Sequence, residues 1–457
     1  MLKGQLREPI HFIGIGGSGM AGIAEMTLHL GFSVQGTDVK SSSSIDRLKN
    51  KGAKITLGHS ATSLDKAGTV VYSSAISTNN PELIEAKKRG LIVLHRSDLL
   101  QILMSNAKAI TVAGTHGKST TSAMIAHVLD DLGCDPKAVI GAEMTRYQSP
   151  LLVGNGDYFV AEADESDGSF LKYRPYVGII TNVELDHLDF FKSQEALLDS
   201  FKSYLGNIDS EGFAIIGWDH PLTRDVGSTY PGDKLTYGFV LGCDVRAREY
   251  RCSNGSSTFM AMVERDSVSC SLPMIGKHNV QNALCTLAVV RGLGLDIKVA
   301  AESLATFNGV KRRLDRVLVN DEIKIFDDYA HNPGKIAACI QSIRQTWPSQ
   351  KLHVVYQPHR FSRLETMYHE MLQSLDGADV VYVLPVYSAG ETTTSDFSPT
   401  RLAEDLRLRM DVEAEPCSSL DDAVSRVKLN FVKPGIVLTV GAGDVWQVAE
   451  KLKDDFA

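Results

Sequence analysis

Short runs of apolar residues alternate with segments of helical periodicity along almost the entire chain. Alternation of this kind predicts βαβ units, which build mainly parallel sheets covered by helices. In the first third, the predicted strands are residues 10–15, 33–38, 69–75 and 91–96. The pattern of hydrophobic and polar positions therefore indicates an α/β protein.

New βα series begin at two further places along the chain. A fresh strand starts at residue 109, and it is followed by predicted strands over 158–164, 176–182 and 213–218. A helix is predicted from residue 279, and another βα series follows a basic stretch that ends near residue 313. We therefore expect three α/β domains, over residues 1–107, 108–313 and 314–457.

Length and composition agree with a globular protein of this size. At about 150 residues per domain, 457 residues suit three domains, and 43% hydrophobic with 22% charged residues is ordinary for globular proteins. The net charge of −8 argues against nucleic acid or an anionic membrane as the main partner. Seven scattered cysteines without a CxxC pair favour free thiols in a reducing compartment. No run approaches about 18 apolar residues, so we expect a cytoplasmic protein without membrane insertion.

The segment FIGIGGSGM, residues 12–20, has the glycine spacing of a dinucleotide-binding fingerprint. Gly14, Gly16 and Gly19 follow a predicted strand and open a predicted helix. Asp38 stands where an acid meets a ribose hydroxyl in such folds. Taken alone, this fingerprint favours an NAD-dependent oxidoreductase.

A second glycine loop, VAGTHGKSTT, occupies residues 112–121. It places Gly114, Gly117, Lys118 and Ser119 between a predicted strand and a predicted helix. Backbone N–H groups there can bind phosphate oxygens, the lysine can meet the terminal phosphates, and the serine hydroxyl can bind Mg²⁺. The full P-loop pattern fails because Val112 replaces its first glycine, so a plain glycine turn with a solvated lysine is the alternative.

Two acidic segments follow later strands of the same predicted domain, at residues 158–167 and 178–189. Either segment alone would commonly be a solvated turn, but together with a glycine–lysine loop they favour a metal–nucleotide site. Side chains alternate along a strand, so Val160, Glu162 and Asp164 share one face, and Glu162 is the last long acid still on the strand. Glu165 lies beyond the strand end, where its direction is unconstrained, and His187 lies in the second segment.

Seven motifs in this order resemble those of the Mur ligases, the ATP-dependent amide-bond-forming enzymes of peptidoglycan precursor synthesis. They are GTHGKS, EADESD, TNVELDHLD, GKHNVQNAL, GVKRRLD, DDYAHNP and QPHRFSR. The opening HFIGIGGSGMAGIAE is similar to that of members that join L-alanine to UDP-N-acetylmuramate. The resemblance covers roughly residues 10–450.

This resemblance implies a fold and a reaction. It implies a Rossmann-like N-terminal domain, a central P-loop-type ATPase domain with a mainly parallel sheet, and a Rossmann-like C-terminal domain. The first glycine loop would then hold the diphosphate of UDP-N-acetylmuramate, and the second would hold ATP with Mg²⁺. L-alanine would be joined to the lactyl carboxylate through an acyl phosphate.

The resemblance also implies a role for individual residues. Lys118, Glu162 and His187 would be catalytic, with Ser119, Glu162 and His187 as the metal ligands. The expected ATP-binding residues are Gly114, Thr115, His116, Gly117, Lys118, Ser119, Thr120, Asn279, Asn282, Arg313 and Asp328. The expected substrate-binding residues are Gly14, Gly16, Gly17, Ser18, Gly19, Met20, Asp38, His331, His359, Arg360 and Arg363.

Several alternatives stay open from the sequence. The Asn279 and Asn282 pair has the spacing of an unremarkable helix surface, and the QPHRFSR segment would also suit an exposed basic helix start. Another UDP-muramyl amino-acid or peptide ligase shares the same motifs. An NAD-dependent oxidoreductase and a non-catalytic nucleotide-binding regulator are the alternatives from other classes, and the oligomeric state is open.

Overall fold

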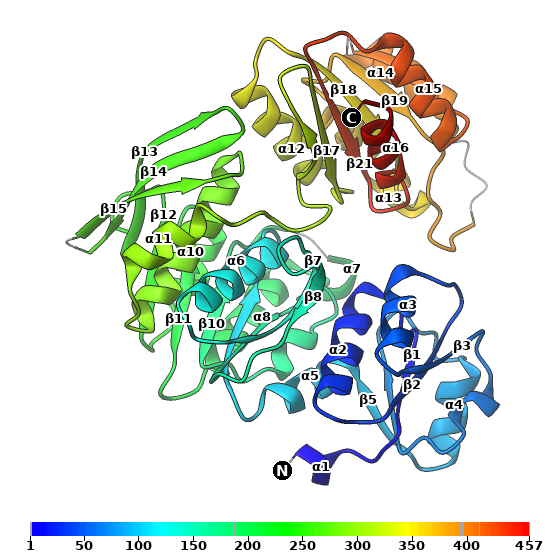
Figure 1. Ribbon diagram of the computed structural model, residues 1–457, viewed down its shortest axis with the longest axis vertical. Helices are drawn as coiled ribbons and strands as arrows, with labels where there is room; N and C mark the ends of the chain where they lie inside the picture. Colours follow the sequence, from blue (N-terminus) through cyan, green and yellow to red (C-terminus); the bar gives the residue numbers. More distant parts are fainter. Residues whose placement is uncertain (1, 186–187, 265, 393–396, 411, 457) are drawn as a thin grey trace. The chain divides into compact units, whose positions relative to one another are not determined.

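The computed structural model describes residues 2–185, 188–264, 266–392, 397–410 and 412–456 (Figure 1). The chain forms two compact units: unit 1 contains residues 1–251, 257–273 and 278–308, and unit 2 contains residues 252–256, 274–277 and 309–457. No helix within the described ranges is long and apolar enough to cross a membrane. All seven cysteines are free thiols.

Unit 1 begins with a five-stranded parallel sheet in the order β3-β2-β1-β4-β5. The order reverses direction between β1 and β4, and in open α/β sheets ligands bind beyond the carboxyl ends of the strands at such a point. The first glycine loop follows β1 there. The strands are β1 (Ile10–Ile13), β2 (Val34–Asp38), β3 (Lys54–Leu57), β4 (Thr69–Tyr72) and β5 (Ile92–His95).

Helices connect the strands of this sheet, as the alternating pattern predicts (Figure 1). Strand β3 was not predicted, because its side chains are mostly exposed and its short segment lacks an apolar run. The helices are α1 (Leu2–Gln5), α2 (Ser18–His29), α3 (Ser43–Asn50), α4 (Pro81–Lys88) and α5 (Arg96–Met104), with the 3₁₀ helix η1 (Ala61–Leu64).

The second sheet of unit 1 has ten strands in the order β15-β14-β13-β12-β11-β10-β6-β9-β7-β8. Its centre is parallel, but the β7–β8 and β14–β15 pairs are antiparallel, so the sheet is mixed. Its strands are β6 (Lys108–Ala113), β7 (Lys137–Met144), β8 (Ser149–Leu152), β9 (Tyr158–Glu162), β10 (Val177–Ile180), β11 (Phe213–Gly217), β12 (Lys234–Gly238), β13 (Val245–Ser253), β14 (Ser256–Val263) and β15 (Asp266–Leu272).

Strand β6 lies between β9 and β10, and both neighbours run parallel to it. Their carboxyl ends therefore meet at one edge, which brings both acidic segments beside the second glycine loop. The connecting helices are η2 (Ser169–Lys172), α6 (Lys118–Asp131), α7 (Leu188–Phe191), α8 (Gln194–Gly206), α9 (Pro221–Ser228), α10 (Lys277–Gly292) and α11 (Ile297–Leu304).

Helix α6, which follows the second glycine loop, is buried on all sides. Every residue from 119 to 129 is buried, including the polar Ser119, Thr120 and Thr121. A helix without an exposed polar face lies inside the protein core. Lys118, at its first position, is thus mounted on an element that core packing holds in place.

Unit 2 contains a six-stranded sheet in the order β16-β17-β21-β18-β19-β20, in which only the β16–β17 pair is antiparallel. The strands are β16 (Asp315–Val319), β17 (Ile323–Asp328), β18 (Lys351–Tyr356), β19 (Val380–Val383), β20 (Glu413–Pro416) and β21 (Gly435–Val440). The helices are α12 (Pro333–Thr346), α13 (Phe361–Gln373), α14 (Pro399–Met410), α15 (Leu420–Asn430) and α16 (Trp446–Phe456).

The three sheets confirm the expected three-domain α/β architecture. In unit 2 the motifs DDYAHNP and QPHRFSR follow β17 and β18, which run parallel on either side of β21. Both motifs therefore leave the same edge of the sheet.

Candidate functional site

Two glycines shape the second glycine loop. Gly114 has a φ of +128° and Gly117 has a φ of +82°, values in the left-handed region that favours glycine. A Cβ added to Gly114 would lie 2.1 Å from the Oγ1 atom of Thr181, so no side chain fits there. The loop is closely packed against the segment that follows β10.

Hydrogen bonds to that segment fix the loop backbone. The Thr115 N–H donates to the carbonyl oxygen of Asn182 at 3.0 Å, and the His116 N–H donates to Asn182 Oδ1 at 2.9 Å. Asn182 Nδ2 donates back to the His116 carbonyl oxygen at 3.1 Å, and Thr181 Oγ1 donates to the same oxygen at 2.6 Å. Sequence reasoning missed Asn182, although it stands within the TNVELDHLD motif.

Lys118 is paired with a buried carboxylate. Its Nζ donates to the Gly114 carbonyl oxygen at 2.6 Å and lies 3.0 and 2.8 Å from the two carboxylate oxygens of Glu165, which is 1% exposed. Burial alone would lower the pKa of Lys118, but the carboxylates of Glu165 and Asp164 outweigh it and raise that pKa. The expectation that the Glu165 side chain lacks a fixed direction is therefore wrong.

Glu162 ends strand β9, opposite Val112 of β6, at the start of the loop. Its Oε1 accepts a hydrogen bond from the Gly141 N–H at 2.6 Å. Strand β9 stops here, so the alternation expected through residue 164 ends two residues earlier. Ser119 is buried in the first turn of α6, and the third predicted metal ligand, His187, lies outside the described residues.

A hydroxyl and a carboxylate are oxygen donors, and such ligands suit Mg²⁺. Ser119 and Glu162 therefore fit the expected ion by their chemistry. Among the residues that the structure describes, no group of three or more His, Cys, Asp or Glu side chains could hold a metal ion. The remaining metal ligands would come from His187, from ATP or from water.

Asn279 and Asn282 lie on α10, 2% and 6% exposed, so the surface alternative for this pair is wrong. Asn282 Oδ1 accepts a hydrogen bond from Thr121 Oγ1 at 3.0 Å, and its Nδ2 donates to Asn279 Oδ1 at 3.3 Å. A Cβ added to Gly117 would lie 2.8 Å from Asn282 Oδ1. The structure thus brings the pair to the second glycine loop, which is called the phosphate loop below after its predicted role.

The rest of the first acidic segment reaches the five-stranded sheet. Asp164 accepts a hydrogen bond from Arg96 Nη2 at 2.9 Å, and Asp167 accepts one from the Ser74 hydroxyl. Burial alone would raise the pKa of Asp164, but Lys118 and Arg96 lower it to about 2. Asp164 therefore stays ionised at neutral pH.

The backbone of the first glycine loop is held by a hydrogen bond to Asp38. Gly14 has a φ of +74°, and the Gly16 N–H donates to Asp38 Oδ2 at 2.8 Å. Gly17 caps the amino end of α2 without a side-chain hydrogen bond, and Met20 is buried in the first turn. Asp38 thus fastens the loop backbone, and the helix end is available to bind an anion.

In unit 2, Asp328 accepts hydrogen bonds from the backbone N–H groups of Leu314 and Ala330, each at 2.6 Å. The Arg313 guanidinium lies over the Tyr329 ring, 5.3 Å from its centroid. Asp328 therefore holds together the segments that precede and follow β16 and β17.

A cluster of histidine and arginine side chains follows β18. The His359 ring stacks on Tyr387, with centroids 5.6 Å apart, and lies 5.8 Å from the His331 ring. Burial, and then the charge of Arg363, lowers the pKa of His331 to about 3 and that of His359 to about 4. Both rings are therefore neutral at pH 7, and the positive charge comes from Arg363 and the half-exposed Arg360.

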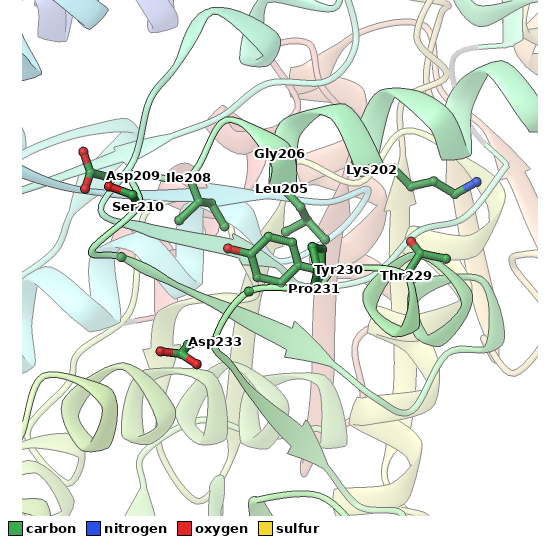
Figure 2. Close-up of a pocket in the computed structure, with 12 residues that line it drawn as sticks. Lys202, Leu205, Gly206, Ile208, Asp209, Ser210, Thr229, Tyr230, Pro231 and Asp233 are labelled. Atoms are coloured by element: carbon green, nitrogen blue, oxygen red, sulfur yellow. The ribbon is translucent and has the colours of Figure 1, made fainter.

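The cavity in Figure 2 lies away from the phosphate loop. It has a volume of about 470 Å³ and is lined by residues such as Lys202, Asp209, Tyr230 and Asp233. These residues surround the amino ends of β11 and β12, whereas the loop follows the carboxyl end of β6. Because β6, β10, β11 and β12 run parallel, the cavity and the loop lie at opposite edges of the sheet.

Family models match the chain in three consecutive parts. Residues 9–108 match the Mur ligase family catalytic domain, residues 112–290 match the Mur ligase middle domain, and residues 312–443 match the Mur ligase glutamate ligase domain.

Curated relatives match over the whole chain. A UDP-N-acetylmuramate–L-alanine ligase of Sulfurihydrogenibium sp. is 38% identical over 99% of this chain and 98% of its own length. An enzyme of the same name from Carboxydothermus hydrogenoformans is 39% identical over 99% and 98%. The crystal structure of UDP-N-acetylmuramate–alanine ligase from Thermotoga maritima superposes with a TM-score of 0.85 at 28% identity, covering 98% of each chain.

Helix α6 has a positive-φ glycine near each end, which provides a matched test of the phosphate loop. Gly117→Ala would place a Cβ 2.8 Å from Asn282 Oδ1, whereas Gly133, with a φ of +75°, has open space around the same position. Both alanines should cost about 1 kcal/mol of stability from backbone strain. We expect only Gly117→Ala to weaken binding of a non-hydrolysable ATP analogue, by tenfold or more, in calorimetry. Equal affinities of the two variants would contradict the loop assignment.

Proposed function

The chain belongs to the Mur ligase family, and we propose which of its residues carry out the family's reaction. It catalyses the ATP-dependent ligation of L-alanine to UDP-N-acetylmuramate in peptidoglycan synthesis. The observation that carries the assignment of the catalytic centre is Lys118 on a buried helix, beside Glu162 at the neighbouring strand end.

A carboxylate does not condense with an amine in water, because oxide is a very poor leaving group. We propose that an oxygen of the lactyl carboxylate attacks the γ-phosphorus of ATP, so that ADP leaves and an acyl phosphate forms. The amine nitrogen of L-alanine then attacks the acyl carbon and loses a proton, and inorganic phosphate leaves. The protein's contribution is to orient the groups and to stabilise their charge.

The second glycine loop is the proposed ATP site. The backbone N–H groups at the start of α6 bind phosphate oxygens, and the Lys118 ammonium neutralises the terminal phosphates. Lys118 Nζ now donates to the Gly114 carbonyl oxygen and to Glu165. When ATP binds, phosphate oxygens replace these two acceptors. Ser119, Glu162 and His187 would hold Mg²⁺, which supplies positive charge to the phosphates when bound.

The first glycine loop and unit 2 are the proposed substrate sites. The uncapped amino end of α2 binds the diphosphate of UDP-N-acetylmuramate. Arg360 and Arg363, beside the neutral His331 and His359, bind a carboxylate of the substrates, because a guanidinium pairs with carboxylates through two parallel hydrogen bonds. The proposed domain boundaries lie near residues 107 and 313 of the chain. The proposed location of the reaction is the cytoplasm, where ATP is available.

The test of the function is phosphate release from ATP in the presence of UDP-N-acetylmuramate and each candidate amino acid. We expect release to require both substrates and to prefer L-alanine over glycine and L-serine. NADH binding in the absence of ATP turnover would instead support the oxidoreductase. Turnover with a peptide and not with L-alanine would support another UDP-muramyl ligase.

Substitution of the two acids near the phosphate loop should change different kinetic parameters. Glu162→Gln removes a negatively charged ligand near the metal, so we expect kcat to fall more than a hundredfold, about 3 kcal/mol, and the magnesium requirement to rise. Glu165→Gln removes the counter-charge of Lys118, so the pKa of Lys118 should fall, and the main change should be in KM for ATP.

Steady-state kinetics of both variants across a magnesium titration distinguish these roles, and circular dichroism confirms that both remain folded. If Glu165→Gln is inactive at all magnesium concentrations while Glu162→Gln turns over normally, the metal-ligand assignment is wrong.

The arginines after β18 should serve the anionic substrate and not ATP. We expect Arg360→Ala or Arg363→Ala to weaken use of UDP-N-acetylmuramate by about 2–4 kcal/mol while an ATP analogue still binds nearly normally. Arg409→Ala, which removes a half-exposed arginine of the same unit that pairs with Asp405, is the control and should change neither. Equal loss of nucleotide affinity would place the cluster in the ATP pocket.

A further inference from the structure

An arginine that belongs to none of the seven motifs lies against the first glycine loop. Arg96 begins α5, directly after β5, so it leaves the same edge of the parallel sheet as that loop. A Cβ added to Gly19 would lie 3.3 Å from Arg96 Nη1 and 3.8 Å from its Cζ. The guanidinium therefore lies against the first turn of α2.

Only one edge of this guanidinium is engaged. Arg96 Nη2 donates to Asp164 Oδ2 at 2.9 Å and lies 4.0 Å from Asp167 Oδ2. Within the described part of the chain, no group accepts a hydrogen bond from Nε or Nη1, although the side chain is only 17% exposed. A guanidinium has five N–H donors, and a largely buried one left without acceptors costs stability. The two carboxylates thus fix its orientation and leave its Nη1 edge for another acceptor.

The surroundings of that edge favour an anion. Gly17 caps the amino end of α2 without a side-chain hydrogen bond, so backbone N–H donors of the first turn lie beside the arginine. The helix dipole places partial positive charge at the same point. Burial lowers the pKa of the adjacent His95 and outweighs the charge of Asp167, which by itself would raise it, so this ring is neutral at pH 7. The local positive charge is that of Arg96 and the helix end.

We propose that Arg96 is a substrate-binding residue whose Nη1 group, which faces the first turn of α2, binds an anionic oxygen of the UDP-sugar there. The oxygen belongs to the diphosphate or to the lactyl carboxylate, which share this chemistry. The inference rests on the proposed placement of UDP-N-acetylmuramate at the first glycine loop. Because the same guanidinium holds Asp164, next to Glu165, it also links the sugar site to the acids of the phosphate loop.

The experiment is isothermal titration of the full-length protein and of Arg96→Gln and Arg96→Lys with UDP-N-acetylmuramate. We expect Arg96→Gln to raise Kd by about ten- to a hundredfold, and Arg96→Lys, which keeps the charge but not the planar fork, to raise it less. UDP-N-acetylglucosamine, which lacks the lactyl carboxylate, distinguishes the two acceptors. An equal loss for both sugars identifies the diphosphate, and a loss only for UDP-N-acetylmuramate identifies the carboxylate.

Two further variants separate binding from structure. Asp164→Asn weakens the same ion pair but keeps Arg96, so UDP-N-acetylmuramate should still bind within about threefold of the parent affinity. Arg89→Gln, at the carboxyl end of α4, replaces another paired arginine of the same sheet domain and should leave binding unchanged. If Asp164→Asn loses as much affinity as Arg96→Gln, the role of Arg96 is structural and the inference is overturned.

Failure of this inference differs from failure of the proposed function. If the parent protein binds UDP-N-acetylmuramate and Arg96→Gln binds it equally well, only the role of Arg96 is overturned. If the parent protein binds neither UDP-sugar, the proposed placement at the first glycine loop is wrong as well.

Discussion

The position of β6 between β9 and β10 is the constraint on which the proposed catalytic centre depends. In a parallel sheet, the segments that follow neighbouring strands leave the same edge, so the phosphate loop receives one support from each side. From β10, Thr181 and Asn182 fix the loop backbone, and from β9, Glu162 and Glu165 bring the negative charge. No single strand and turn could supply both.

Buried charge at this edge is arranged in pairs. Lys118 faces Glu165, and Arg96 faces Asp164, one residue earlier in the chain. Burying an ion is costly unless a partner is close, and breaking such a pair is far more costly than never having it. These pairs keep the charged groups ionised and oriented at the place where a highly charged nucleotide would bind, which is preorganisation of the kind that phosphoryl transfer needs.

The proposed anion site of unit 2 has a different arrangement. Burial and the neighbouring arginine keep His331 and His359 neutral, so these rings supply shape and hydrogen-bonding groups while Arg360 and Arg363 supply charge. Stacking of His359 on Tyr387 connects the segments that follow β18 and β19. The two units thus divide the proposed chemistry between phosphate binding and carboxylate binding.

The sequence by itself determined the α/β class, the two glycine loops and the family, because strand–helix alternation and contiguous motifs are local properties of the chain. The sequence did not determine which side chains contact one another in the folded protein. Asn282 could equally have been a surface residue, and only packing of α10 against the phosphate loop buried it beside Gly117. Glu165 had no direction until β9 was placed next to β6, and Arg96 stands in no motif at all. Periodicity reports which face of an element is apolar, but Lys118 and Glu165 are 47 positions apart and Arg96 and Asp164 are 68 apart. Strand order in the ten-stranded sheet brings Lys118 to Glu165, and contact between that sheet and the five-stranded sheet brings Arg96 to Asp164. Both are decided by packing of the whole unit and not by any local pattern.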